Sequence, residues 1–194
     1  MIKIALRSLV AVVVLALLTG LVYPLVITGV AQLGLRNKAD GSIVTVGGTP
    51  VGSSMIGQAW KGNEWFYGRP SAVSYDASTS SGTNLGPNSG PLARDIASNA
   101  KAILAEEGPY NPGLTAAKIP SDLLTASASG LDPDISEAGA LFQVRRIAAV
   151  RNLPLSQVRS LVEGHVMGPD LGFLGQTRVN VLALNLALVQ LAQR

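Results

Sequence analysis

The chain has 194 residues, 47% of them hydrophobic and 14% charged, and contains no cysteine. This length supports one domain beyond an apolar N-terminus. The absence of cysteine excludes disulfides, thiolate catalysis and cysteine metal sites. The net charge of +3 belongs to the N-terminal part, because the residues beyond Lys38 carry 11 basic and 12 acidic side chains. A domain with this balance shows no basic patch, so nucleic-acid binders are excluded.

An uncharged apolar run covers residues 8–35, with Lys3 and Arg7 before it and Arg36 and Lys38 after it. As a helix it would be about 42 Å long at 1.5 Å per residue. The hydrocarbon core of a bilayer is about 30 Å thick and needs about 20 apolar residues. The run therefore predicts a single membrane-spanning helix.

The expected topology follows from the basic N-terminus and the weakly charged domain. We expect a short cytoplasmic tail at 1–8, a transmembrane helix at 9–30 and an extracytoplasmic, periplasmic domain at 31–194. The alternative is a cleaved signal peptide. The apolar run is longer than the usual apolar region of such peptides, about 7–15 residues, which favours a retained anchor.

The first part of the domain favours strands and a loop. Residues 42–46 and 49–55 are rich in β-branched side chains and are separated by two glycines, which predicts a hairpin. Four aromatic residues within 60–67 indicate a further strand. Gly, Pro, Ser, Thr and Asn dominate 68–91, which is typical of a long ordered loop.

A helix is predicted at 92–107, because Ile96, Ala100, Ile103 and Leu104 share one helical face. Gly108 and Pro109 then end it. The following residues, 109–133, return to loop with one apolar piece at 123–124.

A second helix is expected at 134–151. Asp134 can cap its N-terminus while Glu137 reaches back toward the cap. Its expected buried face consists of five apolar residues or a close subset of them, Ala138, Leu141, Phe142, Ile147 and Val150.

The C-terminal part favours a short helix and a closing strand. Residues 152–154 break the second helix, and Ser156 is expected to cap a short helix that ends near Glu163. A strand is predicted at 179–184, with a few helical residues after it. The mixture of elements indicates an α+β fold: one N-terminal transmembrane helix followed by one compact domain.

The search for catalytic chemistry finds no candidate residue. His165 is the chain's one histidine and lies at the end of a predicted helix, where it can interact with the terminal carbonyls. A zinc site needs three or four ligands, and the composition offers no such set. No recognised glycine-rich phosphate loop occurs. We therefore expect no catalytic site and no metal site.

Two polar segments stand out, 69–87 and 125–133. One interpretation is that they are turns held by their own side chains. The other is that they form a docking surface for another protein. Gln143, Arg145 and Arg146 leave a similar choice between an ordinary solvated helix face and polar contacts to a partner or ligand.

Several motifs, in order along nearly the whole chain, resemble the KdpC subunit family of the potassium-transporting Kdp ATPases. They are 18–25 (LTGLVYPL), 52–58 (GSSMIGQ), 66–72 (FYGRPSA), 80–87 (SSGTNLGP), 122–133 (DLLTASASGLDP) continuing to 144, 173–175 (FLG) and 179–188 (VNVLALNLAL). Two departures are visible. Thr83 replaces the usual serine and keeps the hydroxyl, while Arg145 replaces the usual proline and adds a charge.

The resemblance implies an accessory role without chemistry of its own. Such subunits assemble with a channel-like potassium-binding subunit, an ATP-hydrolysing P-type subunit and a small single-span subunit in the inner membrane. They are described as assembly factors and as catalytic chaperones that raise the ATP affinity of the hydrolysing subunit. No cofactor is expected in the chain itself, because the complex handles ATP and potassium. The alternative function is a membrane-anchored exported enzyme or ligand-binding module.

Three residues of the polar segments are the candidates for partner contact or coupling. Arg69 precedes a rigid proline, Asn84 suits a tight turn, and Asp132 can cap backbone amides beyond Pro133. Gln143 is the candidate for contact with a cofactor, which is otherwise unknown.

Overall fold

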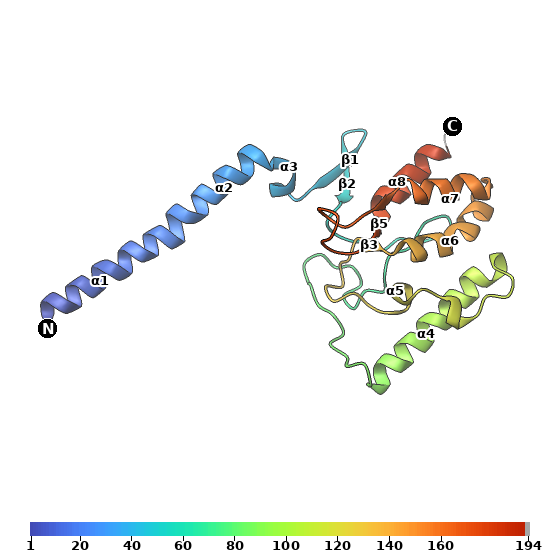
Figure 1. The fold of residues 1–194 in the computed structure, drawn as a ribbon, viewed down its shortest axis with the longest axis horizontal. Helices are drawn as coiled ribbons and strands as arrows, with labels where there is room; N and C mark the ends of the chain where they lie inside the picture. Colours follow the sequence, from blue (N-terminus) through green and yellow to red (C-terminus); the bar gives the residue numbers. More distant parts are fainter. Residues whose placement is uncertain (193–194) are drawn as a thin grey trace. The chain divides into compact units, whose positions relative to one another are not determined.

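The computed structural model describes residues 1–192, so the last two residues of the predicted domain lie outside it. The chain divides into an N-terminal unit, Met1–Pro50, and a second unit that begins at Val51. The α+β fold class predicted from the sequence is confirmed, with one apolar N-terminal helix and a domain of helices and two small sheets (Figure 1).

The N-terminal unit is mainly one continuous apolar helix. It consists of α1 (Ile2–Leu17), a π-helical turn η1 (Leu18–Val22) and α2 (Tyr23–Gly34), and it is long and apolar enough to cross a membrane. The π turn explains how the helix continues past Pro24. The Tyr23 N–H bonds to the Leu18 carbonyl, five residues back, so the proline falls in the first turn of α2, where a missing N–H costs little.

A short helix α3 (Arg36–Ala39) and a β-hairpin follow. The hairpin pairs β1 (Ile43–Val46) with β2 (Thr49–Ser53). Both turn residues, Gly47 (φ +57°) and Gly48 (φ +83°), adopt the left-handed conformation that a tight two-residue turn requires. The predicted hairpin is confirmed, with slightly shorter strands.

The predicted strand at 60–67 is wrong, because this segment is irregular. Its backbone bonds to two side-chain amides instead of to a neighbouring strand. Asn185 accepts from the Phe66 N–H and donates to the Phe66 carbonyl, both at 2.9 Å. Gln143 likewise accepts from the Tyr67 N–H at 2.8 Å and donates to the Tyr67 carbonyl at 3.1 Å. The aromatic residues that suggested a strand thus belong to an extended segment held by helices.

The predicted loop at 68–91 and the helix after it are confirmed. Helix α4 runs over Gly90–Glu107, and the Ser89 hydroxyl caps it by accepting from the Leu92 N–H. Its predicted inner face is the less exposed one. The segment 109–133, predicted as loop, instead contains short helices, η2 (Gly108–Tyr110), η3 (Ala116–Lys118) and α5 (Ser121–Leu124).

The second predicted helix begins later than expected. Helix α6 covers Glu137–Val150, and its cap is Ser136, whose hydroxyl accepts from the Gly139 N–H at 2.9 Å. Asp134 does not cap it, because Asp134 and Ile135 form strand β3 (Asp134–Ile135). Strand pairing across the sheet overrides the local capping signal here.

The predicted inner face of α6 is right at Ile147, partly right at Leu141 and Phe142, which pack against the core, and wrong at Ala138 and Val150. Ala140, Val144 and Ile147 are buried, whereas Ala138 and Val150 are exposed and Leu141 and Phe142 are half-buried. The buried stripe also contains Gln143 and Arg146, which are 2% and 0% exposed. Buried polar groups need bonded partners. Besides bonds within α6, both side chains bond to segments far away along the chain, which hydrophobic periodicity does not reveal.

After α6 come α7 (Leu155–Glu163), β4 (Val166–Met167), β5 (Arg178–Asn180) and α8 (Val181–Leu191). Pro154, and not Ser156, occupies the N-cap position of α7. The predicted strand at 179–184 is mostly wrong. The strand ends at Asn180, whose side chain accepts from the Ala183 N–H and so starts α8.

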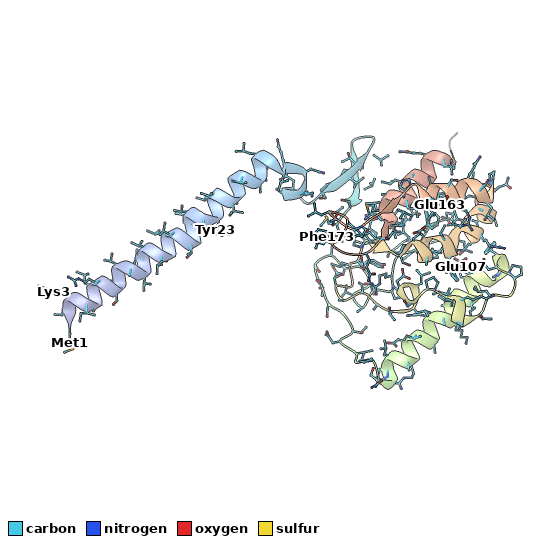
Figure 2. The ribbon with its side chains drawn as sticks, viewed as in Figure 1. Met1, Lys3, Tyr23, Glu107, Glu163 and Phe173 are labelled. Atoms are coloured by element: carbon cyan, nitrogen blue, oxygen red, sulfur yellow. The ribbon has the colours of Figure 1, made fainter. Side chains whose placement is uncertain are left out.

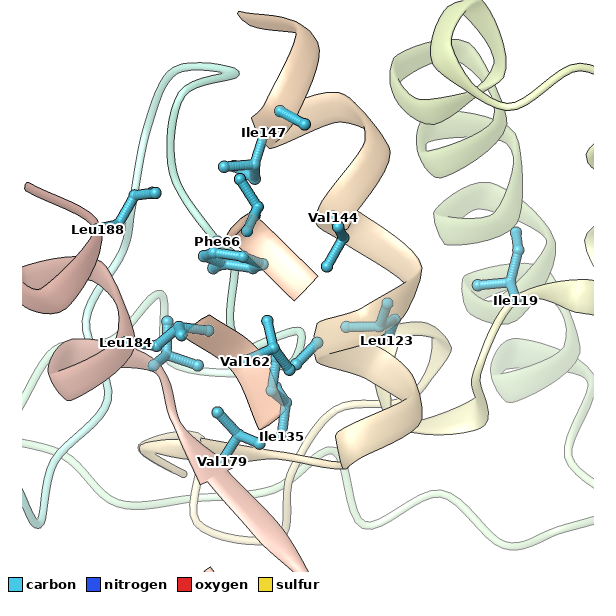
Figure 3. Packing of buried hydrophobic residues seen from close by; sticks show 14 of the residues in the cluster. Phe66, Ile119, Leu123, Ile135, Val144, Ile147, Val162, Val179, Leu184 and Leu188 are labelled. Carbon is cyan, nitrogen blue, oxygen red and sulfur yellow. The ribbon is translucent and has the colours of Figure 1, made fainter. Parts of the chain in front are cut away.

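The second unit's sheet is antiparallel, with strand order β3-β5-β4. Asp134 faces Asn180 in the first pair, and Met167 faces Arg178 in the second. Helices α6, α7 and α8 pack beside this sheet (Figure 1). The core lies between them, and Figure 3 shows Phe66 among side chains of α6 and α8. Its fully buried members include Phe66, Ile147, Val158, Val162, Leu184 and Leu188.

Candidate functional site

The two polar segments singled out in the sequence, 69–87 and 125–133, lie against each other. The Ser71 hydroxyl donates to the Gly130 carbonyl at 2.6 Å. Further bonds join Ser127 N to Pro70 O (3.2 Å), Ser81 N to Ser129 O (3.0 Å) and Ser80 Oγ to Ser129 O (3.2 Å). We call this pair of segments the paired loops. They are one surface built from two parts of the chain.

Two glycines allow the paired loops to approach so closely. A Cβ atom at Gly82 would lie 2.8 Å from the Ala128 carbonyl oxygen. At Gly130 it would lie 2.7 Å from the Ser81 carbonyl oxygen, and the backbone there is left-handed (φ +70°). Side chains at either position would push the segments apart.

Arg69 and Asp132 form an ion pair across the paired loops. Arg69 Nη1 lies 3.2 Å from Asp132 Oδ2, and the side chains are 26% and 30% exposed. Asp132 Oδ1 also accepts from the Asp134 N–H at 3.1 Å, which confirms the predicted capping beyond Pro133. Arg69 Nε is buried and meets no hydrogen-bond partner among the described residues. The structure thus brings these two predicted residues together.

Tyr75 binds the backbone of Arg69, one member of this ion pair. Its hydroxyl donates to the Arg69 carbonyl oxygen. Burial raises the pKa of Tyr75 to about 12, and the nearby Asp132 carboxylate acts in the same direction. The phenol is therefore a neutral donor at physiological pH, and it orients the backbone of Arg69.

Asn84 occupies a different part of the paired loops. It is exposed and left-handed (φ +53°), which agrees with the expected tight turn. Its neighbours Thr83 and Leu85 line a hollow of about 490 Å³ beside α4. Arg69 and Asp132 line a separate hollow of about 230 Å³. The three candidates thus share one surface without forming one cluster.

Gln143 is committed to bonds inside the domain. Its Oε1 accepts from the Tyr67 N–H at 2.8 Å and from Arg146 Nη2 at 2.9 Å. Its Nε2 donates to the carbonyls of Tyr67 and Gly139 at 3.1 and 3.2 Å. The residue lies in the wall of a pocket of about 340 Å³, which Trp60 also lines. Contact with a cofactor stays a prediction, and such a ligand would compete with these bonds.

Arg146 and Glu107 form a buried ion pair that sequence reasoning missed. Arg146 Nε lies 2.7 Å from Glu107 Oε1, and Arg146 Nη1 donates to the carbonyls of Asn63 and Trp65 at 2.6 and 2.9 Å. The guanidinium also lies 4.5 Å from the Tyr67 ring centroid. Arg145 beside it is exposed, so only one of two adjacent arginines is structural. The one signal in the sequence is that Arg145 stands where the resembling family usually has proline.

His165 behaves as predicted at the end of α7. Its Nδ1 lies 2.7 Å from the Leu161 carbonyl oxygen. Among residues 1–192, no group of three or more His, Cys, Asp or Glu side chains is arranged to hold a metal ion.

The fold and this surface define a class of protein. One apolar helix able to cross a membrane precedes an α+β domain that carries two polar loops hydrogen-bonded to each other. This is the organisation of a membrane-anchored protein that presents a preformed surface.

The chain belongs to the KdpC family, "K+-transporting ATPase, c chain", whose model matches residues 5–190. Its relatives include the potassium-transporting ATPase KdpC subunits of Methylorubrum extorquens (48% identical, 96% of both chains), Nitratidesulfovibrio vulgaris (50%, 96% of this chain and 93% of the relative) and Variovorax paradoxus (50%, 93% of both). The similarity therefore covers the apolar helix and the domain together.

Proposed function

We propose that this protein is a non-catalytic accessory subunit of a high-affinity, ATP-driven potassium uptake complex. In this role it is needed for assembly and stability of the complex, and it acts as a catalytic chaperone that raises the ATP affinity of the ATP-hydrolysing subunit. The observation that carries the proposal is the nearly full-length similarity to subunits of potassium-transporting ATPases. The paired loops support it, since a preformed polar surface suits protein docking.

The proposed partners are a channel-like potassium-binding subunit, an ATP-hydrolysing P-type subunit and a small single-span subunit. The proposed setting is the inner membrane, with a cytoplasmic tail at 1–8, a transmembrane helix at 9–30 and a periplasmic domain from residue 31. Arg69, Asn84 and Asp132 are the proposed contact or coupling residues. ATP and potassium are handled by the partners, so the subunit needs no cofactor.

This topology determines how an effect on ATP affinity would have to travel. A periplasmic domain cannot touch ATP bound in the cytoplasm, so the effect would pass through the membrane helices as a coupling free energy. Such energies are typically about 1–3 kcal/mol, which corresponds to a change in affinity of about 5–150-fold. The same factor should describe how ATP strengthens binding of this subunit to the complex.

A deletion strain tests the proposal. In a host without another high-affinity uptake system, loss of the chain should abolish growth on limiting potassium and the potassium-dependent ATPase activity of membranes. Alanine variants at Arg69, Asn84 and Asp132 should restore both incompletely and recover less partner protein in a pull-down. Normal growth of the full deletion would refute the pump role. Full rescue by all three variants would refute only the proposed contact residues.

The pocket beside Gln143 favours a second candidate function, a membrane-anchored ligand-binding module. Its volume of about 340 Å³ and the aromatic residues in its wall, Trp60, Tyr67, Tyr75 and Phe142, are typical of small-molecule sites. The purified protein alone distinguishes the two candidates. A ligand-binding module should bind small molecules without partners, whereas the accessory subunit should be inert until it is assembled.

A further inference from the structure

The loop between β4 and β5, residues 168–175, exposes three large apolar side chains. Leu171, Phe173 and Leu174 are 83%, 74% and 50% exposed. Figure 2 shows Phe173 at the edge of the domain. Single exposed apolar residues are common on protein surfaces, but a contiguous apolar group on a projecting loop indicates an interaction site.

Hydrogen bonds within the loop give it a defined shape. Asp170 and Leu174 exchange two backbone bonds, with N–O distances of 2.8 and 2.9 Å. The Gly172 N–H donates to the Pro169 carbonyl at 3.1 Å, and the Phe173 N–H donates to the Asp170 carbonyl at 3.3 Å. The N–H groups of residues 170 and 172–174 are thus bonded within the loop, so the loop is preformed.

Leu171 adopts a conformation that leucine disfavours. Its φ of +53° lies in the left-handed region, where bulky side chains are uncommon. The Leu171 side chain is exposed to water, so burial of apolar surface does not offset this unfavourable backbone conformation. Strain of this kind concentrates at functional sites, where it is part of the function.

The charged side chains near this loop lie where it joins the strands, which we call its base. Arg178 donates to the Gly168 carbonyl at 3.3 Å and pairs with Asp170 (3.4 Å) and Asp134 (3.3 Å). The one acidic side chain of the loop is therefore partly neutralised. An apolar tip above a paired, polar base matches the boundary between lipid tails and headgroups.

The domain is tethered to an apolar helix that is able to cross a membrane. The apolar helix that ends at Gly34 connects to the second unit through residues 35–50. Even fully extended, this connection spans at most about 60 Å. Tethering of this kind raises the effective concentration of a surface near the membrane, so weak contacts are sufficient.

We propose that the 168–175 loop inserts Leu171, Phe173 and Leu174 into the lipid interface of the membrane that the chain's N-terminal helix enters. Backbone groups in a lipid environment must be bonded internally, and this loop meets that requirement at the N–H groups of residues 170 and 172–174. The insertion would give the domain a second membrane contact and fix its orientation. It goes beyond the proposed pump role, because it depends only on membrane anchoring.

The experiment uses the full chain in phosphatidylcholine vesicles, at less than one chain per vesicle. Because the natural chain has no cysteine, Leu171→Cys creates a single labelling position for an environment-sensitive fluorophore. Leu155→Cys is the matched control, since Leu155 is also an exposed leucine (44%) but lies at the start of α7. Nitroxide-labelled lipid should quench the label at 171 and not at 155, whereas aqueous iodide should do the reverse.

A second comparison tests the apolar contribution. The double substitution Phe173→Ser and Leu174→Ser, in the labelled 171 background, should lower the inserted population at least about tenfold, because each lost apolar contact weakens transfer into lipid. Leu155→Ser in the same background should change nothing. Native fluorescence of Trp60 and Trp65 verifies in each variant that the domain is folded.

Three outcomes would overturn the proposal. Iodide quenching at 171 equal to that at 155 would place the loop in water. Shielding that appears only at many chains per vesicle would assign it to a second copy of this chain. Shielding that appears only after the other pump subunits are added would assign it to a protein partner.

Discussion

Arg146 of α6 and Glu107 of α4 form a 2.7 Å ion pair with side chains only 0% and 3% exposed. The same guanidinium reaches the carbonyls of Asn63 and Trp65, so it joins two helices and an irregular segment. Burial raises the pKa of Glu107, while the charge of Arg146 acts in the opposite direction. Such a pair contributes little net stability when intact, but removing one partner leaves a buried charge unpaired.

The first prediction concerns this pair. Arg146→Met or Glu107→Gln should lower the free energy of unfolding by about 3–5 kcal/mol, because each leaves the other group buried without its partner. Urea unfolding of the full chain in detergent, followed by tryptophan fluorescence, measures this. Both tryptophans, Trp60 and Trp65, lie in the second unit. Arg145→Met is the matched control and should change little; equal midpoints for the two arginine variants would contradict the assignment.

The second prediction tests the face of α6. Ile147 is completely buried, and Ile147→Ala should cost about 2–5 kcal/mol. Val150 on the same helix is 39% exposed, so Val150→Ala should change stability by less than about 0.5 kcal/mol. The same urea titration measures both. A larger loss at 150 than at 147 would contradict the burial of these two residues described above.

The third prediction concerns the close approach of the paired loops. Gly130→Ala should destabilise the domain by about 1–3 kcal/mol, because it combines a left-handed backbone with a contact to the Ser81 carbonyl. Gly82→Ala should act in the same direction through its contact with Ala128. Gly86→Ala in the same segment is the control, since its Cβ would meet nothing within 4 Å.

Pull-down of partner subunits with these three glycine variants gives a second readout. If the paired loops form the docking surface, Gly82→Ala and Gly130→Ala should recover less partner protein than Gly86→Ala. Equal recovery from all three, with the expected stability loss, would show that the close approach matters for folding alone.

The fourth prediction is a pH dependence. The folded-state pKa of Tyr75, about 12, lies above the ordinary value of 10.0. Its contribution to stability is therefore full below pH 10 and is lost as the pH rises from 10 to 12. Tyr75→Phe should reduce this alkaline loss and should cost about 0.5–1.5 kcal/mol at neutral pH through the missing hydrogen bond to Arg69.

Thermal melts of the natural chain and the Tyr75→Phe variant between pH 8 and about pH 12 test this. Burial, followed by Glu106, also raises the pKa of Tyr67, so the variant should keep part of the decline. Parallel curves for the two proteins over this range would show that Tyr75 ionisation is not coupled to unfolding.

Much of the local structure could be predicted because its causes are local. The glycine pair at 47–48 permits the hairpin turn, the apolar period predicts α4, and the Asp132 side chain bonds to a backbone amide two residues away. The uncharged run predicts the long helix from its composition alone. In each case the deciding interaction lies within a few residues along the chain.

The failures have the opposite character. At 60–67 the aromatic residues favoured a strand, but Asn185 and Gln143 supply the backbone partners from 119 and 76 residues away. At 179–184 the prediction was a strand, whereas burial of one continuous side of α8 and capping by Asn180 produce a helix. The burial of Arg146 depends on Glu107, 39 residues away.

The sequence by itself determined the apolar helix, the α+β class and the two polar segments of the candidate surface, because these follow from composition, periodicity and turn chemistry. Only the tertiary structure decided that the polar segments are one surface, that Arg69 pairs with Asp132, and that Gln143 and Arg146 are buried. The physical reason is that a polar side chain can be buried only where its partners are, and those partners come from segments that folding alone brings together.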